Sequence, residues 1–192
     1  TMHTHVLSAA AHAALPPTAR HASAAPPMDT AAFQALYDAQ LTAVYNYARY
    51  RLGDADAEDT CADAFARAWA ARAAFDPARG PASAWLWAIA RNAVTDRLRR
   101  RAHAPLALSP GIAAPDDVHD TAVGRWNWER LVAAVDALPD LDHDIVALRI
   151  GAGLGHDAVA AAVGLSAGAV AQRLHRILGR LRRVVDGEEE LR

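Results

Sequence analysis

The sequence has almost no cysteine and no lysine. Cys61 is the one cysteine among 192 residues, which excludes an internal disulfide and a zinc site built from several thiolates, and favours a reducing compartment. No apolar run approaches the roughly 20 residues that a membrane-spanning helix needs. The first residues also lack a basic segment followed by an apolar stretch, the pattern of an export signal. We therefore expect a cytoplasmic protein without membrane insertion.

Motifs of familiar catalytic chemistry are missing as well. The sequence has no glycine-rich phosphate loop, no His-Glu-x-x-His zinc motif, no Gly-x-Ser-x-Gly turn and no Cys-x-x-Cys pair. Cys61 lies on the apolar stripe of a predicted helix, which favours a buried small hydrophobe over a nucleophile. We expect no catalytic residue, no metal site and no cofactor, and hence a protein that is not an enzyme.

Alanine and arginine are abundant instead. Hydrophobic residues make up 53% of the chain, which is too many for disorder throughout. The chain contains 49 alanines, and all 20 of its basic residues are arginine. A net charge of −2 argues against a general polyanion binder. The charges are nevertheless sorted along the chain, and this sorting points to specific partners.

The apolar pattern is helical in two separate parts of the chain. Residues 1–28, rich in Ala, Pro and His, predict a disordered tail, and residues 29–102 predict a domain of three helices. Residues 103–125 have the composition of a linker. Residues 126–186 predict a second helical domain, and an acidic tail follows at 187–192. We expect an all-α protein with two small domains joined by a flexible linker, each steadied by a partner.

The first domain is predicted to have helices at about 30–52, from residue 54 onward and at about 82–100. Gly53 ends the first helix, and the turn formers at 75–81 indicate a loop. Residues 54–63 carry five carboxylates and no basic residue, a placement that suits a helix N-terminus. The predicted core stripe of the first helix comprises Phe33, Leu36, Tyr37, Leu41, Val44, Tyr45, Ala48 and Leu52.

The second domain is predicted to contain four helices, at about 126–137, 140–150, 157–163 and 167–185. The last two of these are predicted to form a helix-turn-helix. Ala160, Gly164 and Val170 have the spacing of such a motif: a small residue at the helix crossing, a glycine turn and a branched anchor. Short helix pairs of this kind also occur in bundles that never bind DNA. A cap at Ser166 and donors for base edges and phosphates favour DNA binding; the donors are Gln172, Arg173, His175 and Arg176.

The first domain adds an aromatic and arginine-bearing loop and a third helix with Trp85, Trp87, Arg91 and Asn92. Its acidic helix start could bind a basic protein surface, while the loop and third helix could meet single-stranded or distorted DNA. Tryptophans at helical spacing are more often core residues than platforms for stacking bases. Both interpretations of the two rings stay open at this point.

Taken together, these residues resemble the extracytoplasmic-function group of RNA polymerase sigma factors. The letters FQALY at 33–37, AFARAW at 64–69 and AWLWAIARN at 84–92, with VYNY, RLG and DAED between them, resemble sigma region 2. The letters LP, ALRI, GL, GLS and RLHR, from 138 to 176, resemble region 4. The resemblance covers about two thirds of the chain, and it implies a subunit that binds core polymerase, directs it to promoters and helps open the DNA.

The resemblance also implies roles for individual residues. Partners would be core polymerase, through its β′ clamp and β flap, promoter DNA and an anti-sigma factor, and the linker would thread toward the polymerase active-site channel. Core polymerase would bind at four acids, Asp56, Glu58, Asp59 and Asp63. The minus-ten element, including a flipped base, would bind at Phe75, Arg79, Asn92, Asp96 and Arg99. The minus-thirty-five element would bind at Ser166, Ala169, Gln172, Arg173, His175 and Arg176.

The sequence departs from the family pattern before RLHR, where the usual Thr-Val-Lys-Ser is replaced by residues 169–172, AVAQ. A hydroxyl and a cation that commonly touch DNA are lost, so promoter sequence does not carry over. Two other functions stay open: a conventional regulator with an N-terminal sensor or dimerisation domain, and a sigma-like protein that sequesters a partner. The acidic helix together with an Asn-bearing third helix favours the sigma factor over the sensor domain.

Overall fold

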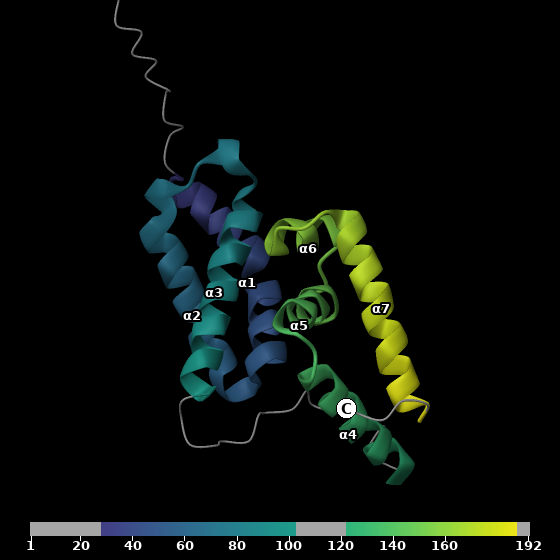
Figure 1. Ribbon diagram of the computed structural model, residues 1–192. Helices are drawn as coiled ribbons and strands as arrows, with labels where there is room; N and C mark the ends of the chain where they lie inside the picture. Colours follow the sequence, from purple (N-terminus) through teal and green to yellow (C-terminus); the bar gives the residue numbers. More distant parts are fainter. Residues whose placement is uncertain (1–27, 103–121, 188–192) are drawn as a thin grey trace, which may run out of the picture.

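The computed structural model describes residues 28–102 and 122–187, and every regular element in these segments is a helix (Figure 1). The predicted all-α fold with two helical domains is confirmed. For residues 102 and 122–127 only the backbone is described. Residues 1–27 of the tail predicted at 1–28, most of the linker, and residues 188–192 lie outside the described residues. Met28, the last residue of the predicted tail, is instead 8% exposed and belongs to the hydrophobic core.

The N-terminal domain is a bundle of α1 (Thr30–Leu52), α2 (Asp54–Ala71) and α3 (Ala82–Ala102). Asp29 caps α1, since its Oδ1 accepts a hydrogen bond from the Ala32 N–H at 2.7 Å. Gly53 ends α1 with a φ of 77°, in the left-handed region that favours glycine. As a result α2 begins at the next residue and packs back along α1.

The core of this bundle differs from the predicted stripe of α1 in which of two tyrosines is buried. Tyr47 is 0% exposed, whereas Tyr45, which the apolar pattern predicts to lie in the stripe, is 37% exposed. The reason is that Tyr47 faces a partner on α3: its ring meets that of Trp87 at 5.7 Å, edge to face. Trp87 is itself 1% exposed, so the core interpretation is confirmed for this tryptophan.

The predicted loop between α2 and α3 contains two short 3₁₀ turns, η1 (Arg72–Ala74) and η2 (Pro77–Arg79). Asp76 organises the second turn, because its Oδ1 accepts a hydrogen bond from the Ala78 N–H at 2.9 Å. Gly80 follows with a φ of 140°, a conformation that other residues rarely adopt. The loop is therefore a defined structure rather than an irregular connection.

The C-terminal domain comprises α4 (Ala122–Asp136), α5 (Asp140–Val146), the π-helical η4 (Ala147–Gly151), α6 (His156–Val163) and α7 (Ala167–Val185). Two expectations differ in detail. Helix α4 begins four residues before the expected start at 126 and includes Gly124, which is tolerated there because 122–125 contain no proline. The single helix expected at about 140–150 is divided into α5 and η4. In η4 the hydrogen bonds become the wider ones of a π-helix, as from the Ala152 N–H to the Ala147 carbonyl oxygen.

The two domains pack directly against each other. Helix α6 lies beside α3, and η4 packs on α1, whereas α7 lies on the outer side, against α4, α5 and α6 (Figure 1). The contact is close at Gly151, where a Cβ would lie 3.0 Å from Cβ of Tyr50. The sequence pattern gave no sign of this packing, and it means that each small domain is steadied by the other.

Candidate nucleic-acid and partner interfaces

The acidic start of α2 divides into paired and exposed carboxylates. Asp56 is 8% exposed, and its two oxygens form ion pairs with Arg97 and Arg101 of α3. The hydrogen bond from Arg97 is the main reason that the pKa of Asp56 lies below its usual value. Asp56 therefore fastens α2 to α3, and its predicted contact with polymerase stays a prediction.

Asp63 belongs to a second bridge between the same helices. Arg67, one turn along α2, contacts Asp63 at 2.7 Å and Asp96 of α3 at 2.7 Å. Hydrogen bonding from Arg67 lowers the pKa of Asp96, so this carboxylate stays ionised. Both Asp63 and Asp96 are half-buried, and their predicted roles must coexist with this structural one.

Glu58 and Asp59 are the predicted polymerase-facing acids that the structure leaves exposed. Glu58 also borders a groove of about 640 Å³ between α1 and α2. Apart from Glu58 and Thr42, the residues that line it are apolar or aromatic: Tyr37, Leu41, Tyr45, Cys61, Ala62 and Phe65. An apolar groove with a carboxylate at its edge, next to the exposed Asp59 in sequence, suits a helix that carries both apolar and basic side chains.

Cys61 lies in the wall of this groove and is 4% exposed. Burial raises the pKa of its thiol to about 11, so the thiol stays protonated and unreactive near neutral pH. The interpretation of Cys61 as a buried small hydrophobe is confirmed.

A pocket of about 320 Å³ lies where the α2–α3 loop meets the start of α3. Its aromatic wall consists of Phe75 and Trp85, whose ring centroids are 5.4 Å apart. Arg79 and Gly80 lie at its rim, and Ala161 of α6 in the C-terminal domain also lines it. Aromatic walls with a nearby guanidinium suit an unstacked nucleobase, because such a site can stack on the base and pair with phosphate.

A polar stripe on α3 extends away from this pocket. Trp85, Asn92, Asp96 and Arg99 recur at helical spacing and so share one face of α3. Asn92 and Arg99 are exposed. The structure thus brings all five residues predicted for the minus-ten element to one side of the N-terminal domain, in the loop or on the helix that follows it.

The predicted helix-turn-helix has the expected geometry. Gly164 ends α6 in the left-handed region, with a φ of 73°. Ser166 caps α7, since its Oγ accepts from the Ala169 N–H at 3.2 Å. Val170 is fully buried and anchors α7 on the domain core. The turn, cap and anchor that sequence spacing predicted are all present.

Helix α7 presents a polar face opposite its buried stripe. Ala169, Gln172 and Arg176 recur at helical spacing on that face, and Gln172 and Arg176 are exposed. His175 is exposed to one side of it. Arg173 is half-buried and forms an ion pair with Asp142 of α5, so this guanidinium also has a structural partner.

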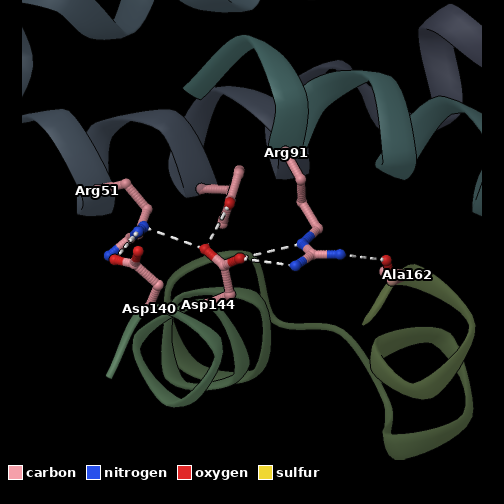
Figure 2. Close-up of polar contacts among 6 residues, drawn as sticks. Arg51, Arg91, Asp140, Asp144 and Ala162 are labelled. Atoms are coloured by element: carbon pink, nitrogen blue, oxygen red, sulfur yellow. Dashed lines mark hydrogen bonds and ion pairs between the residues drawn. The ribbon is translucent and has the colours of Figure 1, made fainter. Parts of the chain in front are cut away.

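A charged cluster that sequence reasoning missed joins the two domains (Figure 2). Asp144 of α5 is 5% exposed. Its Oδ2 accepts hydrogen bonds from Nε and Nη2 of Arg91 at 3.0 and 2.9 Å, and its Oδ1 lies 3.1 Å from Nε of Arg51. The hydroxyl of Tyr47 donates to Oδ1 at 2.8 Å. Burial and the neighbouring carboxylate raise the pKa of Tyr47 well above its usual value.

One sequence signal could have pointed to this cluster. Asp144 directly precedes the buried run Ile145–Leu148, and a carboxylate beside such a run needs a cationic partner. Which arginines supply it depends on how the domains pack, and that packing has no local signature in the sequence.

An apolar groove of about 520 Å³ lies between α4, η4 and α7, with Tyr50 of α1 at its edge. Ile150 and Leu178, which are 56% and 45% exposed, lie at this groove. Large apolar side chains so open to solvent typically mark a binding surface. Within the described residues, no group of three or more His, Cys, Asp or Glu is placed to hold a metal ion, and no helix is long and apolar enough to cross a bilayer.

Comparison with known proteins agrees with this geometry. The family model for Sigma-70 region 2 matches residues 36–104, and that for Sigma-70 region 4 matches residues 128–181. Regions 2 and 4 in one all-helical chain define a protein of the sigma-70 class, which binds core RNA polymerase and promoter DNA.

Named relatives narrow the class. The chain is 32% identical over 127 residues to the ECF RNA polymerase sigma factor RpoE of Cereibacter sphaeroides, covering 66% of this chain and 70% of the relative. It is 31% identical over 170 residues to the ECF sigma factor SigL of Mycobacterium tuberculosis, covering 83% and 92%. The chain therefore belongs to the extracytoplasmic-function (ECF) RNA polymerase sigma factors.

Two solved structures share the fold. CnrH in complex with the cytosolic domain of CnrY has a TM-score of 0.58 and 25% identity, over 84% of this chain and 92% of that one. The sigma factor RpoE of Bartonella quintana, in complex with the anti-sigma factor NepR, has a TM-score of 0.59 and 20% identity, over 82% and 98%.

Proposed function

We propose that this sigma factor contacts core polymerase mainly through the outer face of α2 and the adjoining groove between α1 and α2. Glu58 and Asp59 carry this proposal, because they are exposed while Asp56 and Asp63 are engaged by arginines of their own domain. Exposed carboxylates beside an apolar groove favour a basic, amphipathic helical partner, and the β′ clamp is the partner that the family implies.

The minus-ten element is proposed to bind at the loop pocket and along the polar stripe of α3. Phe75 and Trp85 supply an aromatic platform for a flipped base, and Arg79 lies at the rim to meet the phosphate chain. Asn92 and Arg99 continue the same face with an amide and a cation. The structural bridge between Asp96 and Arg67 holds this face in place.

The minus-thirty-five element is proposed to bind to the polar face of α7. Gln172 offers the amide geometry that pairs with adenine, and Arg176 offers the guanidinium geometry that pairs with guanine. Since Ala169 carries no polar group, it can contribute only apolar contact, for example with a thymine methyl. Promoter preference in this protein therefore depends on fewer polar side chains than the family pattern supplies.

The apolar groove between α4, η4 and α7 is proposed to receive the β flap of polymerase. The exposed Ile150 and Leu178 support this, since their apolar surface is unfavourable in water unless a partner covers it. The protein is proposed to carry out no catalytic step itself and to act in the cytoplasm, where polymerase and DNA meet. CnrH and RpoE form complexes with CnrY and an anti-sigma factor, which supports an anti-sigma partner here as well.

The test is in vitro transcription from a library of promoters, with core polymerase of the source organism. Transcripts that start downstream of a shared two-part motif only when the protein is added are the expected result. Absence of both transcripts and a complex with core polymerase would favour a conventional regulator instead. A complex without transcripts would favour the sequestering protein.

A further inference from the structure

The groove between α1 and α2 belongs to a longer run of aromatic side chains. Tyr37 and Phe65 face each other across the two helices, with ring centroids 4.7 Å apart, and one turn further on the rings of Phe33 and Trp69 meet at 5.1 Å. Together with Tyr45 these residues form what we call the aromatic strip. Tyr45 and Trp69, at its two ends, are 37% and 38% exposed, so the strip presents apolar surface to solvent.

The two ends of the aromatic strip carry opposite charges. At the Tyr45 end, the exposed carboxylate of Glu58 borders the groove. At the Trp69 end, the guanidinium of Arg72 lies 3.7 Å from the ring centroid and covers one face of the ring. A chain that lies along the strip is therefore best uncharged at the Trp69 end and cationic at the Tyr45 end.

The residues that precede the described part of the chain are attached at the Trp69 end. Met28 is 8% exposed and lies in the same hydrophobic cluster as Phe33, and α1 begins at Thr30. Whatever precedes Met28 is thus tethered beside the aromatic strip. Tethering by a short linker gives an effective concentration on the order of mM, so even a weak contact with the strip is populated.

The composition of the tethered segment matches the strip. Residues 16–27 read PPTARHASAAPP, with two prolines at each end. Residues 1–28 contain no Asp or Glu, and their one arginine is Arg20. Proline-rich segments favour the extended polyproline II conformation, which forms no internal hydrogen bonds and which grooves lined by aromatic rings bind.

The lengths place the cation beside the acid. From Phe33 to Tyr45, α1 rises about 18 Å at about 1.5 Å per residue. A polyproline II segment rises about 3.1 Å per residue, so about six residues span the same length. Counted back from Pro27, that length ends at His21, next to Arg20. Arg20 then reaches the end of the strip where Glu58 lies.

We propose that residues 16–27 bind along the aromatic strip in an extended conformation, with Pro26 and Pro27 at the Trp69 end and Arg20 beside Glu58. The occupant of this surface in the free protein is thus a segment of the same chain. The groove is the surface proposed above to receive a polymerase helix, so the segment competes with core polymerase for it. This competition rests on the proposed function, whereas the contact itself does not.

The absence of lysine from the chain makes a direct test possible. Arg20→Lys keeps the cation and introduces the one side-chain amine of the protein. A carbodiimide joins an amine to a carboxylate without a spacer, and mass spectrometry of the full chain locates the bond. We expect the amine to couple to Glu58 at least about threefold more than to Asp29 or Asp38, although these exposed acids are nearer along the chain. Adding Glu58→Gln should abolish that product.

The prolines supply a matched pair of variants in the same Arg20→Lys background. Pro26→Ser with Pro27→Ser removes the two rings placed on the aromatic strip, and should lower coupling to Glu58 at least about threefold. Pro16→Ser with Pro17→Ser makes the same change beyond the Glu58 end, and should leave coupling unchanged. Coupling spread evenly over the exposed acids, no coupling, or equal effects of the two pairs would overturn the proposed contact.

Binding to core polymerase tests the competition. Arg20→Glu places an acid opposite Glu58 and should release the segment. Because a covered groove divides the apparent affinity by the fraction of protein in which it is open, we expect the variant to bind core polymerase at least about twofold more tightly than wild type. Thr4→Glu adds an acid to the same tail outside 16–27, and should leave the affinity unchanged.

The two measurements separate the two proposals. Coupling to Glu58 together with tighter polymerase binding by Arg20→Glu supports the whole inference. Coupling with unchanged binding by that variant would refute the competition. Failure of wild type and Arg20→Glu alike to bind core polymerase would refute the proposed function, and the coupling to Glu58 would still decide whether the segment occupies the aromatic strip.

Discussion

The two surfaces assigned to DNA differ in how the fold holds them and in how open they are. The α3 surface is fastened by charges, through Asp56 with Arg97 and through Arg67 with Asp96, and the other domain lies against it. The α7 surface rests on an apolar stripe and a serine cap, and faces solvent. One surface is therefore sensitive to charge and to domain movement, whereas the other depends on local helix packing.

The largest expected effect is on the free energy of unfolding, through the ion pairs that join α2 to α3. Asp56→Lys would place a third cation beside Arg97 and Arg101 at a position that is 8% exposed, and should lower the free energy of unfolding by about 3 to 5 kcal/mol. Thermal or urea unfolding measures this. Glu58→Lys makes a charge reversal of the same kind at an exposed site, and should change stability by less than about 0.5 kcal/mol while weakening polymerase binding. Equal destabilisation by the two variants would contradict the division of the acidic segment.

A second prediction concerns pH and the contact between the domains. Burial, aided by Arg51, lowers the pKa of His143 to about 4. Tyr50 and Arg51 face it from α1, and Asp140 and Asp144 accompany it on α5. Since the unfolded chain takes up this proton at higher pH than the folded one, stability should fall by roughly 1 to 3 kcal/mol as the pH drops from about 6.5 to about 4.

The contribution of His143 is isolated by comparison with His143→Gln, in unfolding experiments across the same pH range. In the variant, the free energy of unfolding should fall less steeply with decreasing pH, because the contribution of this imidazole is absent. Identical slopes in the two proteins would show that His143 does not sense the contact.

A third prediction tests the α7 surface alone. Arg176→Ala should weaken promoter binding by about 1 to 3 kcal/mol if the guanidinium contacts a base, with the loss concentrated on one base position of the minus-thirty-five element. Binding to a panel of single-base variants of that element measures it. Equal loss on every sequence would indicate a phosphate contact instead. Arg149→Ala, a half-buried arginine on η4 outside that surface, serves as the control.

The smallest expected effect concerns the cap of α7. Ser166→Ala removes the acceptor for the Ala169 N–H and should cost about 0.5 to 2 kcal/mol of stability. Ser166→Gly should cost less, because glycine is a better N-cap than alanine. Urea unfolding of the two variants compares them. No difference between alanine and glycine would mean that the cap contributes little here.

Sequence patterns predicted the local structure well and the tertiary contacts poorly. Gly53, Gly164 and Ser166 determine turns and caps through their own backbone and side chains, and they lie where spacing placed them. Tyr47 and Tyr45 could not be told apart, since burial depends on which neighbour each ring meets.

The role of the acids shows the same limit. Asp56, Glu58 and Asp59 look alike in a list of charges, and only the position of α3 decides that Asp56 is paired while the other two are exposed. Asp144 and Gly151 were missed because their meaning depends on a second domain. The roles of residues whose contacts lie within one turn of a helix can be predicted from the sequence. The roles of residues whose contacts lie in the other domain cannot.

The most direct test of the difference between the two DNA surfaces uses two probes from one promoter. One is a duplex with the minus-thirty-five element, and the other is a single strand with the minus-ten element. The variant Tyr50→Cys with Gly151→Cys places two thiols across the contact between α1 and η4, where the Cβ positions are 3.0 Å apart, so that a disulfide holds the domains together in its oxidised form. Fluorescence anisotropy would measure the binding of each probe to this variant in its oxidised and its reduced form. We predict equal affinity for the duplex in both states, and at least about fivefold weaker binding of the single strand in the oxidised state. Equal binding of the single strand in the two states would contradict the account.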